Sequence, residues 1–214
     1  HHHSTLNPKA MYQIETPLDD VMNAEMISYP NTKLMCSVNV DGSAAAVLVS
    51  EKKAKELGMG RAIKVRASAL ASDPYTDRDL VMPDVNSCTR IAVKEAYEQA
   101  GLGAEDINLV ELHDCFATAE MLHYENLGLC KDGDAGKMID DGDVELGGRI
   151  PVNVSGGLLS KGHPLGATGI ANIYEVCTHL RGEAGKRQVD GATIGMTHVI
   201  GLGTACAIHI LEKT

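Results

Sequence analysis

Apolar and small residues recur at helical spacing in one long stretch of the chain and in three shorter ones. The clearest signal starts at Asp84, continues with such residues three or four positions apart, and ends at Gly101. A glycine directly after a periodic stretch is typical of a helix end. Further helices are predicted over 51–57, 117–126 and 167–181.

Short apolar runs predict the strands, which are expected over 33–50, 63–70, 107–112, 192–198 and 203–211. The first run is interrupted by Asp41-Gly42, a turn signal, and predicts a strand, a tight turn and then a buried strand. The last two runs predict a terminal antiparallel hairpin. Strands interleaved with helices and finished by a hairpin indicate an α/β layered domain with a mixed sheet.

Two polar stretches break this pattern and are expected to be loops. Residues 1–33 contain three prolines and lack a sustained period, and residues 131–148 are rich in Asp and Gly. The chain opens with His1-His2-His3 and no methionine, which fits either a truncated affinity tag or a fragment that begins inside a longer polypeptide.

Composition narrows the class of protein. With 214 residues, 44% of them hydrophobic, the chain can bury a core in one large domain or in parts of two. The net charge is −10 and the basic residues are scattered, so nucleic acid is not expected as a partner. We find neither an export signal nor an apolar run of about 18 residues, and expect a cytoplasmic or organelle-matrix protein without a membrane partner.

The cysteines give no sign of a structural metal or of a disulfide framework. The 6 cysteines are widely spaced and form no C-x-x-C pair. We expect most of them to be small buried residues. One stands in HDCF at 113–116, at the carboxyl edge of the strand predicted over 107–112. Backbone N–H groups at a following helix lower a thiol pKa from about 8.5, so Cys115 is a candidate reactive thiol, although this motif alone is weak.

Two glycine-rich motifs are the other candidates for chemistry. In NVSGGLLSKGHPLGATG at 153–169, glycines let the backbone approach a ligand closely, and His163 is fixed between a glycine and a proline. The spacing matches neither a P-loop nor a dinucleotide fingerprint. HVIGLG at 198–203 is a tight turn near the same edge of the predicted sheet. The remaining histidines at 123, 179 and 209 show no ligand spacing and are expected to be ordinary packing residues.

Taken together, HDCF, NVSGGLLSKGHPLGATG, LRGEAGKRQV at 180–189 and HVIGLG resemble the thiolase superfamily, specifically the sterol carrier protein-x type and its bacterial relatives. The opening HHHSTLNPKAMYQ is also similar to sequence just after the midpoint of that family, which favours the fragment interpretation. The resemblance implies a layered αβαβα thiolase fold of two similar halves. Residues 1–60 would end the loop region and the N-terminal half, and 61–214 would form the C-terminal half with a mixed five-stranded sheet.

The implied reaction is cleavage of a 3-oxoacyl-CoA by CoA, or the reverse Claisen condensation. By resemblance, Cys115 is the acid/base at the α-carbon, His163 activates the nucleophile and His113 contributes to an oxyanion hole. Ser155, Gly156 and Gly157 would line the pantetheine channel, and backbone N–H groups near Gly201 would support the oxyanion hole or orient the thiol. The nucleophilic cysteine of the family lies in the N-terminal half and matches no residue here.

The implied partners are acyl-CoA and CoA as substrates, with no bound cofactor or metal, and the N-terminal half of the same enzyme. The family usually forms homodimers or tetramers, and some relatives work with a small zinc-ribbon/OB-fold protein. Two alternatives stay open: a retro-aldolase that acts on a hydroxyacyl-CoA, and a non-catalytic acyl-CoA-binding subunit. The intact His113 and His163 argue against the first. Val199 departs from the HNLG usual in these relatives, which puts a side-chain role at that position in doubt.

Overall fold

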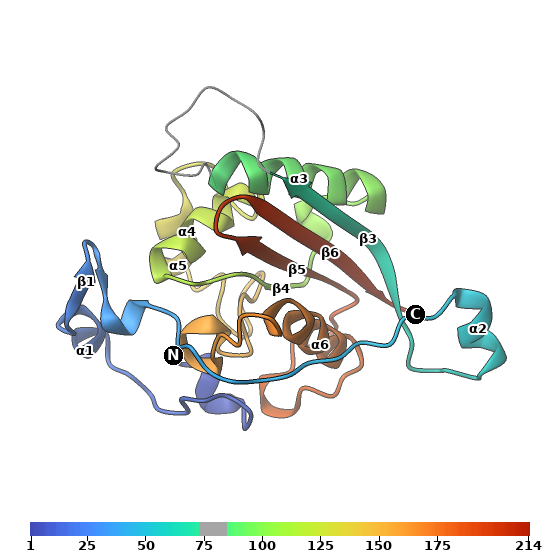
Figure 1. Ribbon diagram of the computed structural model, residues 1–214, viewed down its shortest axis with the longest axis horizontal. Helices are drawn as coiled ribbons and strands as arrows, with labels where there is room; N and C mark the ends of the chain where they lie inside the picture. The colour runs from blue at the N-terminus through green and yellow to red at the C-terminus, as the bar shows by residue number, and fades with distance from the viewer. Residues whose placement is uncertain (73–84) are drawn as a thin grey trace.

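The computed structural model describes residues 1–72 and 85–214, and a four-stranded sheet organises them (Figure 1). Its strands are β3 (Ile63–Ser72), β4 (Leu109–Glu111), β5 (Ile194–Gly201) and β6 (Ala205–Lys213), in the order β3-β6-β5-β4. β6 is antiparallel to both neighbours, whereas β4 and β5 are parallel. The predicted mixed α/β sheet and the terminal hairpin are therefore confirmed.

The predicted fifth strand is wrong for the part of the chain that the structure describes. Residues 150–153 lie beside β4, at the edge where a fifth strand could pair, but they share only an isolated parallel bridge with it, Val110 to Val152. The Val110 N–H donates to the carbonyl of Pro151 at 3.0 Å, and the Asn153 N–H donates to the carbonyl of Val110 at 2.9 Å. Asn153 then turns to a φ of 50°, which ends the extended backbone before a ladder can form.

Helices cover both faces of the sheet (Figure 1). On one face lie α3 (Val85–Ala100) and α4 (Ala117–Asn126), and on the other lies α6 (Thr168–Leu180). Neighbouring strand residues face opposite layers, because side chains alternate along a strand. Val110 and Ile210 belong to the core beneath α3, whereas Leu109 and Leu211 pack with α6. β4 and most of β5 are buried on both faces, which explains why these two strands read as continuous apolar runs.

The helices expected from periodicity are present. They are α3, α4, α6 and the short α2 (Glu51–Glu56). Gly101, at a φ of 66°, ends α3 in the left-handed region that favours glycine. The expected start of α3 at Asp84 lies outside the described residues. No helix among the described residues is long and apolar enough to cross a membrane.

Three expectations about irregular segments are wrong. The stretch 131–148 contains a helix, α5 (Ala135–Asp140). Residues 1–33 contain α1 (Leu18–Met22) and a hairpin of β1 (Met26–Ser28) and β2 (Asn31–Thr32). The expected buried strand before residue 50 is a drawn-out segment without a strand partner in the described chain (Figure 1), and it leaves Val47 86% exposed and Leu48 81% exposed. A strand is buried only where neighbours cover it, so the apolar pattern alone misled the prediction. The proposed boundary at residue 60 stays a prediction.

Candidate functional site

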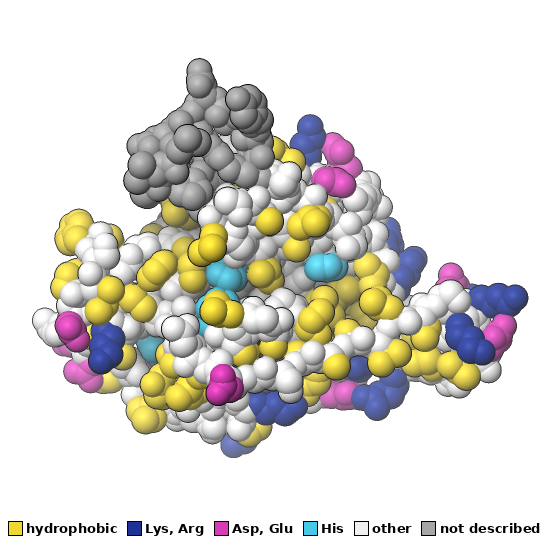
Figure 2. Space-filling view, in the orientation of Figure 1, with side chains coloured by type: hydrophobic (Ala, Val, Ile, Leu, Met, Phe, Trp, Pro, Cys, Tyr) yellow, Lys and Arg dark blue, Asp and Glu magenta, His cyan; other side chains and the backbone are white. Residues whose placement is uncertain are grey.

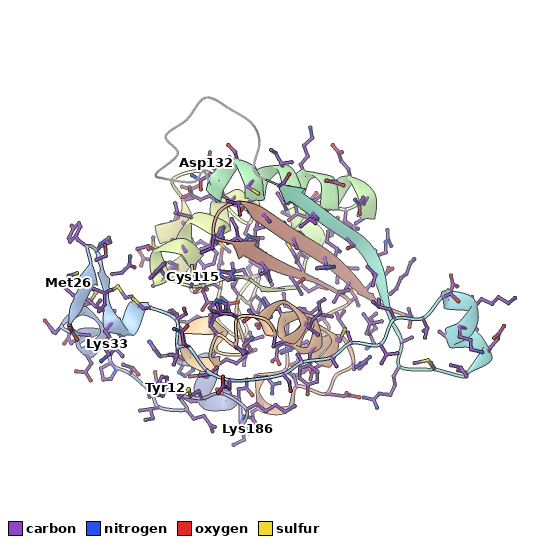
Figure 3. All side chains as sticks on the ribbon, in the orientation of Figure 1. Tyr12, Met26, Lys33, Cys115, Asp132 and Lys186 are labelled. Atoms are coloured by element: carbon purple, nitrogen blue, oxygen red, sulfur yellow. The ribbon has the colours of Figure 1, made fainter. Side chains whose placement is uncertain are left out.

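The candidate site lies at the carboxyl end of β4, where the chain leaves the sheet and starts α4. His113 is buried there, Cys115 is half-buried, and Phe116 is the residue before the first turn of α4. Figure 3 labels Cys115 at the end of the sheet toward which the β5 arrow points. The strand run predicted over 107–112 therefore delivers HDCF to this edge, as expected from the sequence.

Two side chains hold the backbone where β4 ends. The N–H of Leu112 donates to Asn153 Oδ1 at 2.9 Å, and the N–H of His113 donates to His198 Nδ1 at 3.4 Å. Both side chains are buried, and each is the first residue of a glycine-bearing motif. Side-chain acceptors thus satisfy N–H groups that have left the β-ladder, as buried backbone groups require.

Two carboxylates on either side of His113 tie the glycine-rich segment to this strand end. Glu111 accepts from the Ser155 N–H at 3.0 Å and from its hydroxyl at 2.6 Å, with Lys161 Nζ 3.6 Å away. Asp114 accepts from the N–H groups of Leu158 at 2.8 Å and Leu159 at 3.4 Å. Burial raises the pKa of Glu111, against the opposing effect of Lys161 and Ser155, and burial also raises the pKa of Asp114.

Glycine is required where the two segments touch. Gly157 has a φ of +60°, and a Cβ there would collide with the Asp114 carboxylate. Gly156 has a φ of +100° and would place a Cβ 2.6 Å from the Cβ of Ser4. Ser155 itself is fully buried and its hydroxyl is held by Glu111. The glycines thus permit the close backbone approach that the sequence suggested, and what they approach here is the HDCF segment and the start of the chain.

An extended segment, residues 36–39, lies between HDCF and the GHP motif. The Ser37 N–H donates to the carbonyl of Cys115 at 2.9 Å, and the Val38 N–H donates to the carbonyl of Leu158 at 3.2 Å. The N–H of His163 donates to the carbonyl of Val38 at 2.7 Å. Backbone hydrogen bonds through this segment therefore fix Cys115 and His163 relative to one another.

The structure brings His113 and His163 together. Their ring centroids are 5.0 Å apart and the ring planes are perpendicular, at 86°. In the space-filling view, histidine side chains reach the surface near the middle of the face shown (Figure 2). Two imidazoles from motifs about 50 residues apart in the sequence thus share one location at the edge of the sheet, which is where ligand sites of α/β folds commonly occur.

The hydrogen bonds of Thr168 determine which nitrogen of His163 carries its proton. His163 Nδ1 lies 2.7 Å from Thr168 Oγ1, and that hydroxyl donates to the carbonyl of Pro164 at 3.1 Å. Because the hydroxyl hydrogen is already used, Thr168 accepts from Nδ1–H. Neutral His163 then keeps a lone pair on Nε2, the form that a general base needs.

Burial keeps the imidazoles neutral and the thiol protonated. Desolvation, with a smaller effect of His163, lowers the pKa of His113 to about 4. Desolvation and then Lys161 lower the pKa of His163. For Cys115, desolvation and then the Asp114 carboxylate raise the pKa. The expectation that the start of α4 lowers this pKa is therefore wrong, because burial and a neighbouring acid outweigh the helix N–H groups.

We expect acid to destabilise the fold through these imidazoles. Burial also lowers the pKa of His123 to about 4, whereas an unfolded histidine titrates near 6.5. The unfolded chain therefore binds protons first, and the stabilisation is complete above about pH 6.5 and is lost as the pH falls toward 4. At pH 5 the loss is on the order of 2 kcal/mol for one such imidazole. Urea unfolding at several pH values measures this. His123→Leu should flatten the pH dependence, and an unchanged slope would contradict the assignment.

The third motif contributes to the site through a residue that the sequence did not single out. Gly201 lies exposed at the end of β5, paired with Ala205, and no described contact joins it to Cys115. His198, at the start of that motif, is the residue that reaches the site. Sequence reasoning also did not choose four other supporting residues, which are Glu111, His123, Asn153 and Thr168, and it assigned no role to Asp114 of HDCF.

Comparison with known proteins identifies the family. A family model described as "Thiolase C-terminal domain-like" matches residues 76–213. The chain belongs to this family. It is similar to sterol carrier protein 2 of Oryctolagus cuniculus, at 43% identity over 99% of this chain and 40% of that protein. It is equally similar to acetyl-CoA acetyltransferase of Methanothermobacter thermautotrophicus, at 43% identity over 100% of this chain and 56% of that protein.

A solved structure resembles almost the whole length of the present chain. That structure, described as "Ltp2-ChsH2(DUF35) aldolase", superposes with a TM-score of 0.82 at 26% identity, covering 99% of this chain and 55% of its own. The thiolase fold inferred from the motifs is thereby confirmed. The chain spans about half the length of the curated relatives it matches, 40% of one and 56% of another.

Proposed function

We propose that this chain supplies the acid/base half of the active site of an acyl-CoA thiolase, an acyltransferase that cleaves a 3-oxoacyl-CoA with CoA or runs the reverse condensation. One observation carries the proposal: the rings of His113 and His163 meet edge to face, with centroids 5.0 Å apart, and His113 stands two residues before Cys115 at the end of β4. The similarity to an acetyl-CoA acetyltransferase supports the reaction class. The N-terminal half of the enzyme would supply the nucleophilic cysteine.

In the proposed cleavage, His163 takes the proton of that cysteine on Nε2, and the thiolate attacks the 3-carbonyl carbon. The C2–C3 bond breaks, and its electron pair passes to C2 as the enolate of the departing acyl-CoA. Cys115 gives its S–H proton to C2 and becomes a thiolate. It then takes the proton of the incoming CoA thiol, whose sulfur attacks the acyl-enzyme and releases the nucleophile paired with the His163 imidazolium.

The electrostatics of the described residues suit these roles. A thiol whose pKa is raised by burial stays protonated until an enolate needs a proton, as the first half-reaction requires. A neutral His113 is available to donate one N–H to the enolate oxygen without placing a full charge in the site. The glycine-rich turn of Ser155, Gly156 and Gly157 is proposed to border the channel for the pantetheine arm. Backbone N–H groups near Gly201 are proposed to support the oxyanion hole or to orient the thiol.

We also propose ligands and protein partners for this chain. Acyl-CoA and CoA are the proposed ligands, and an N-terminal half would complete each subunit of a homodimer or tetramer. The similar solved structure is that of Ltp2 together with ChsH2, a DUF35 protein. This pairing supports a partner protein for the present chain as well, with the zinc-ribbon/OB-fold type as the proposed class.

The same structure favours one alternative, aldol cleavage of a hydroxyacyl-CoA, because the protein it describes is an aldolase. Such a reaction needs neither CoA as co-substrate nor a cysteine nucleophile. The paired histidines favour the thiolase, since each has a defined task in thiolysis.

An assay of the complete enzyme separates these functions. We expect loss of a 3-oxoacyl-CoA that depends on added CoA and yields two acyl-CoA products. Cleavage of a 3-hydroxyacyl-CoA without added CoA, together with inertness toward the 3-oxo compound, would establish the aldolase instead. Binding of both compounds without turnover of either would leave the acyl-CoA-binding subunit.

A further inference from the structure

A second pair of histidines lies behind the first. His198 on β5 and His123 on α4 are both fully buried, and their ring centroids are 4.3 Å apart with a tilt of 53°. His198 follows Thr197, which pairs with Glu111 in the parallel ladder, so it stands where that ladder would continue beside Leu112. Its side chain points to the same face as Met196 and Ile200, toward the layer that holds α4. The pair therefore fills the space between the sheet and α4.

His198 connects this pair to the candidate site. Its Nδ1 accepts the N–H of His113, and no other hydrogen bond of its ring is found within the described part of the chain. Because Nδ1 accepts, the proton of neutral His198 must lie on Nε2. An apolar residue at this position would leave the buried N–H of His113 without an acceptor, which the local backbone would have to relieve by moving.

His123 restrains the accepting ring. Its imidazole packs against that of His198, so it hinders a turn of His198 that would replace Nδ1 by a carbon. The backbone of His113 is thus fixed on one side by His198 and, one residue earlier, on the other side by Asn153. Its ring extends from this fixed backbone toward His163.

We infer that His198, backed by His123, is a positioning residue of the active site: it holds the backbone of His113 so that the His113 ring stays perpendicular to that of His163. This inference rests on the proposed thiolase function for its kinetic consequence, but its structural part does not depend on turnover. His198 acts through His113 and is not proposed to touch the substrate or the reacting atoms.

Two variants of the complete enzyme test the acceptor role. His198→Leu removes the acceptor, whereas His198→Asn keeps one in its side-chain carbonyl. We expect His198→Leu to lower kcat for CoA-dependent cleavage about 10-fold with little change in KM, because a small displacement of an oriented group slows chemistry more than binding. His198→Asn should stay within about 3-fold of the parent in both constants. Equal loss in both variants would overturn the acceptor role, and so would parent-like kcat in His198→Leu.

Nuclear magnetic resonance of enzyme labelled with ¹⁵N-histidine supplies a readout that needs no activity. We expect His198 in the Nε2–H form, and displaced His113 ring signals in His198→Leu but not in His198→Asn. If the parent enzyme proves inactive in thiolysis, these signals alone decide the inference, so its failure is distinct from failure of the proposed function. If His198→Leu does not fold, His123→Leu replaces it, with the same displacement expected. Unmoved His113 signals, or a His198 proton on Nδ1, would overturn the inference.

Discussion

Replacing Cys115 by alanine should lower kcat for cleavage of a 3-oxoacyl-CoA by at least about 10²-fold, the usual contribution of a general acid or base. The reason is that no other thiol adjoins HDCF in the described structure except that of Cys36, whose sulfur donates to the carbonyl of Thr32. Without the S–H group at 115, the departing enolate must take its proton from water. Steady-state rates of the complete enzyme measure the effect.

Cys130→Ala is the matched control for this variant. Cys130 is also half-buried, and burial likewise raises the pKa of its thiol, but it lies beyond the far end of α4. We expect parent-like kcat in this control and an unchanged urea midpoint in both variants. A Cys115→Ala enzyme that turns over like Cys130→Ala would reject the acid/base role.

Replacing His163 by alanine should have an effect of similar size, at least about 10²-fold, on a different step. The Thr168 contact leaves Nε2 of His163 free to take a proton, so its removal should slow formation of the acyl-enzyme. A rapid-mixing measurement of the first turnover separates this step from later transfer to CoA. Alkylation of the nucleophilic cysteine near neutral pH should slow in parallel, since the thiolate is the reactive form.

His209→Asn provides the control for the imidazole. His209 lies on β6, where its Nδ1 is 3.3 Å from Thr197 Oγ1, and burial lowers its pKa as it does for His163. We expect acylation at the parent rate in His209→Asn. Parent-like acylation in His163→Ala would mean that another group activates the nucleophile.

Local sequence patterns of apolar, polar and glycine residues predicted most of the fold. The periodicity that ends at Gly101, the apolar run that delivers HDCF and the hairpin of β5 and β6 all depend on local chemistry, and the structure has them. The prediction of a buried strand at Val47 and Leu48 was wrong, because the burial of a strand depends on what lies beside it. The prediction of a fifth strand was wrong, because Asn153 adopts a left-handed backbone conformation and ends the extended segment.

The sequence motifs of the candidate site were predictable, but the residues whose hydrogen bonds position those motifs were not. His113 and His163 stand in recognisable runs, and the structure places them together. Glu111 bonds to Ser155, 44 residues later, and His198 bonds to His113, 85 residues earlier. No local sequence pattern encodes such distant contacts. The direction of the Cys115 pKa likewise depends on burial and on Asp114, so a rule based on the helix start alone gave the wrong sign.

In the proposed mechanism, the thiol of Cys115 moves a proton to and from the carbon next to a thioester. Exchange of the methyl hydrogens of acetyl-CoA for deuterium in heavy water, followed by mass spectrometry, measures that transfer without carbon–carbon bond cleavage. We expect steady exchange with the complete parent enzyme and with Cys130→Ala, and exchange at least about 10²-fold slower with Cys115→Ala. Exchange at the parent rate in Cys115→Ala would contradict it.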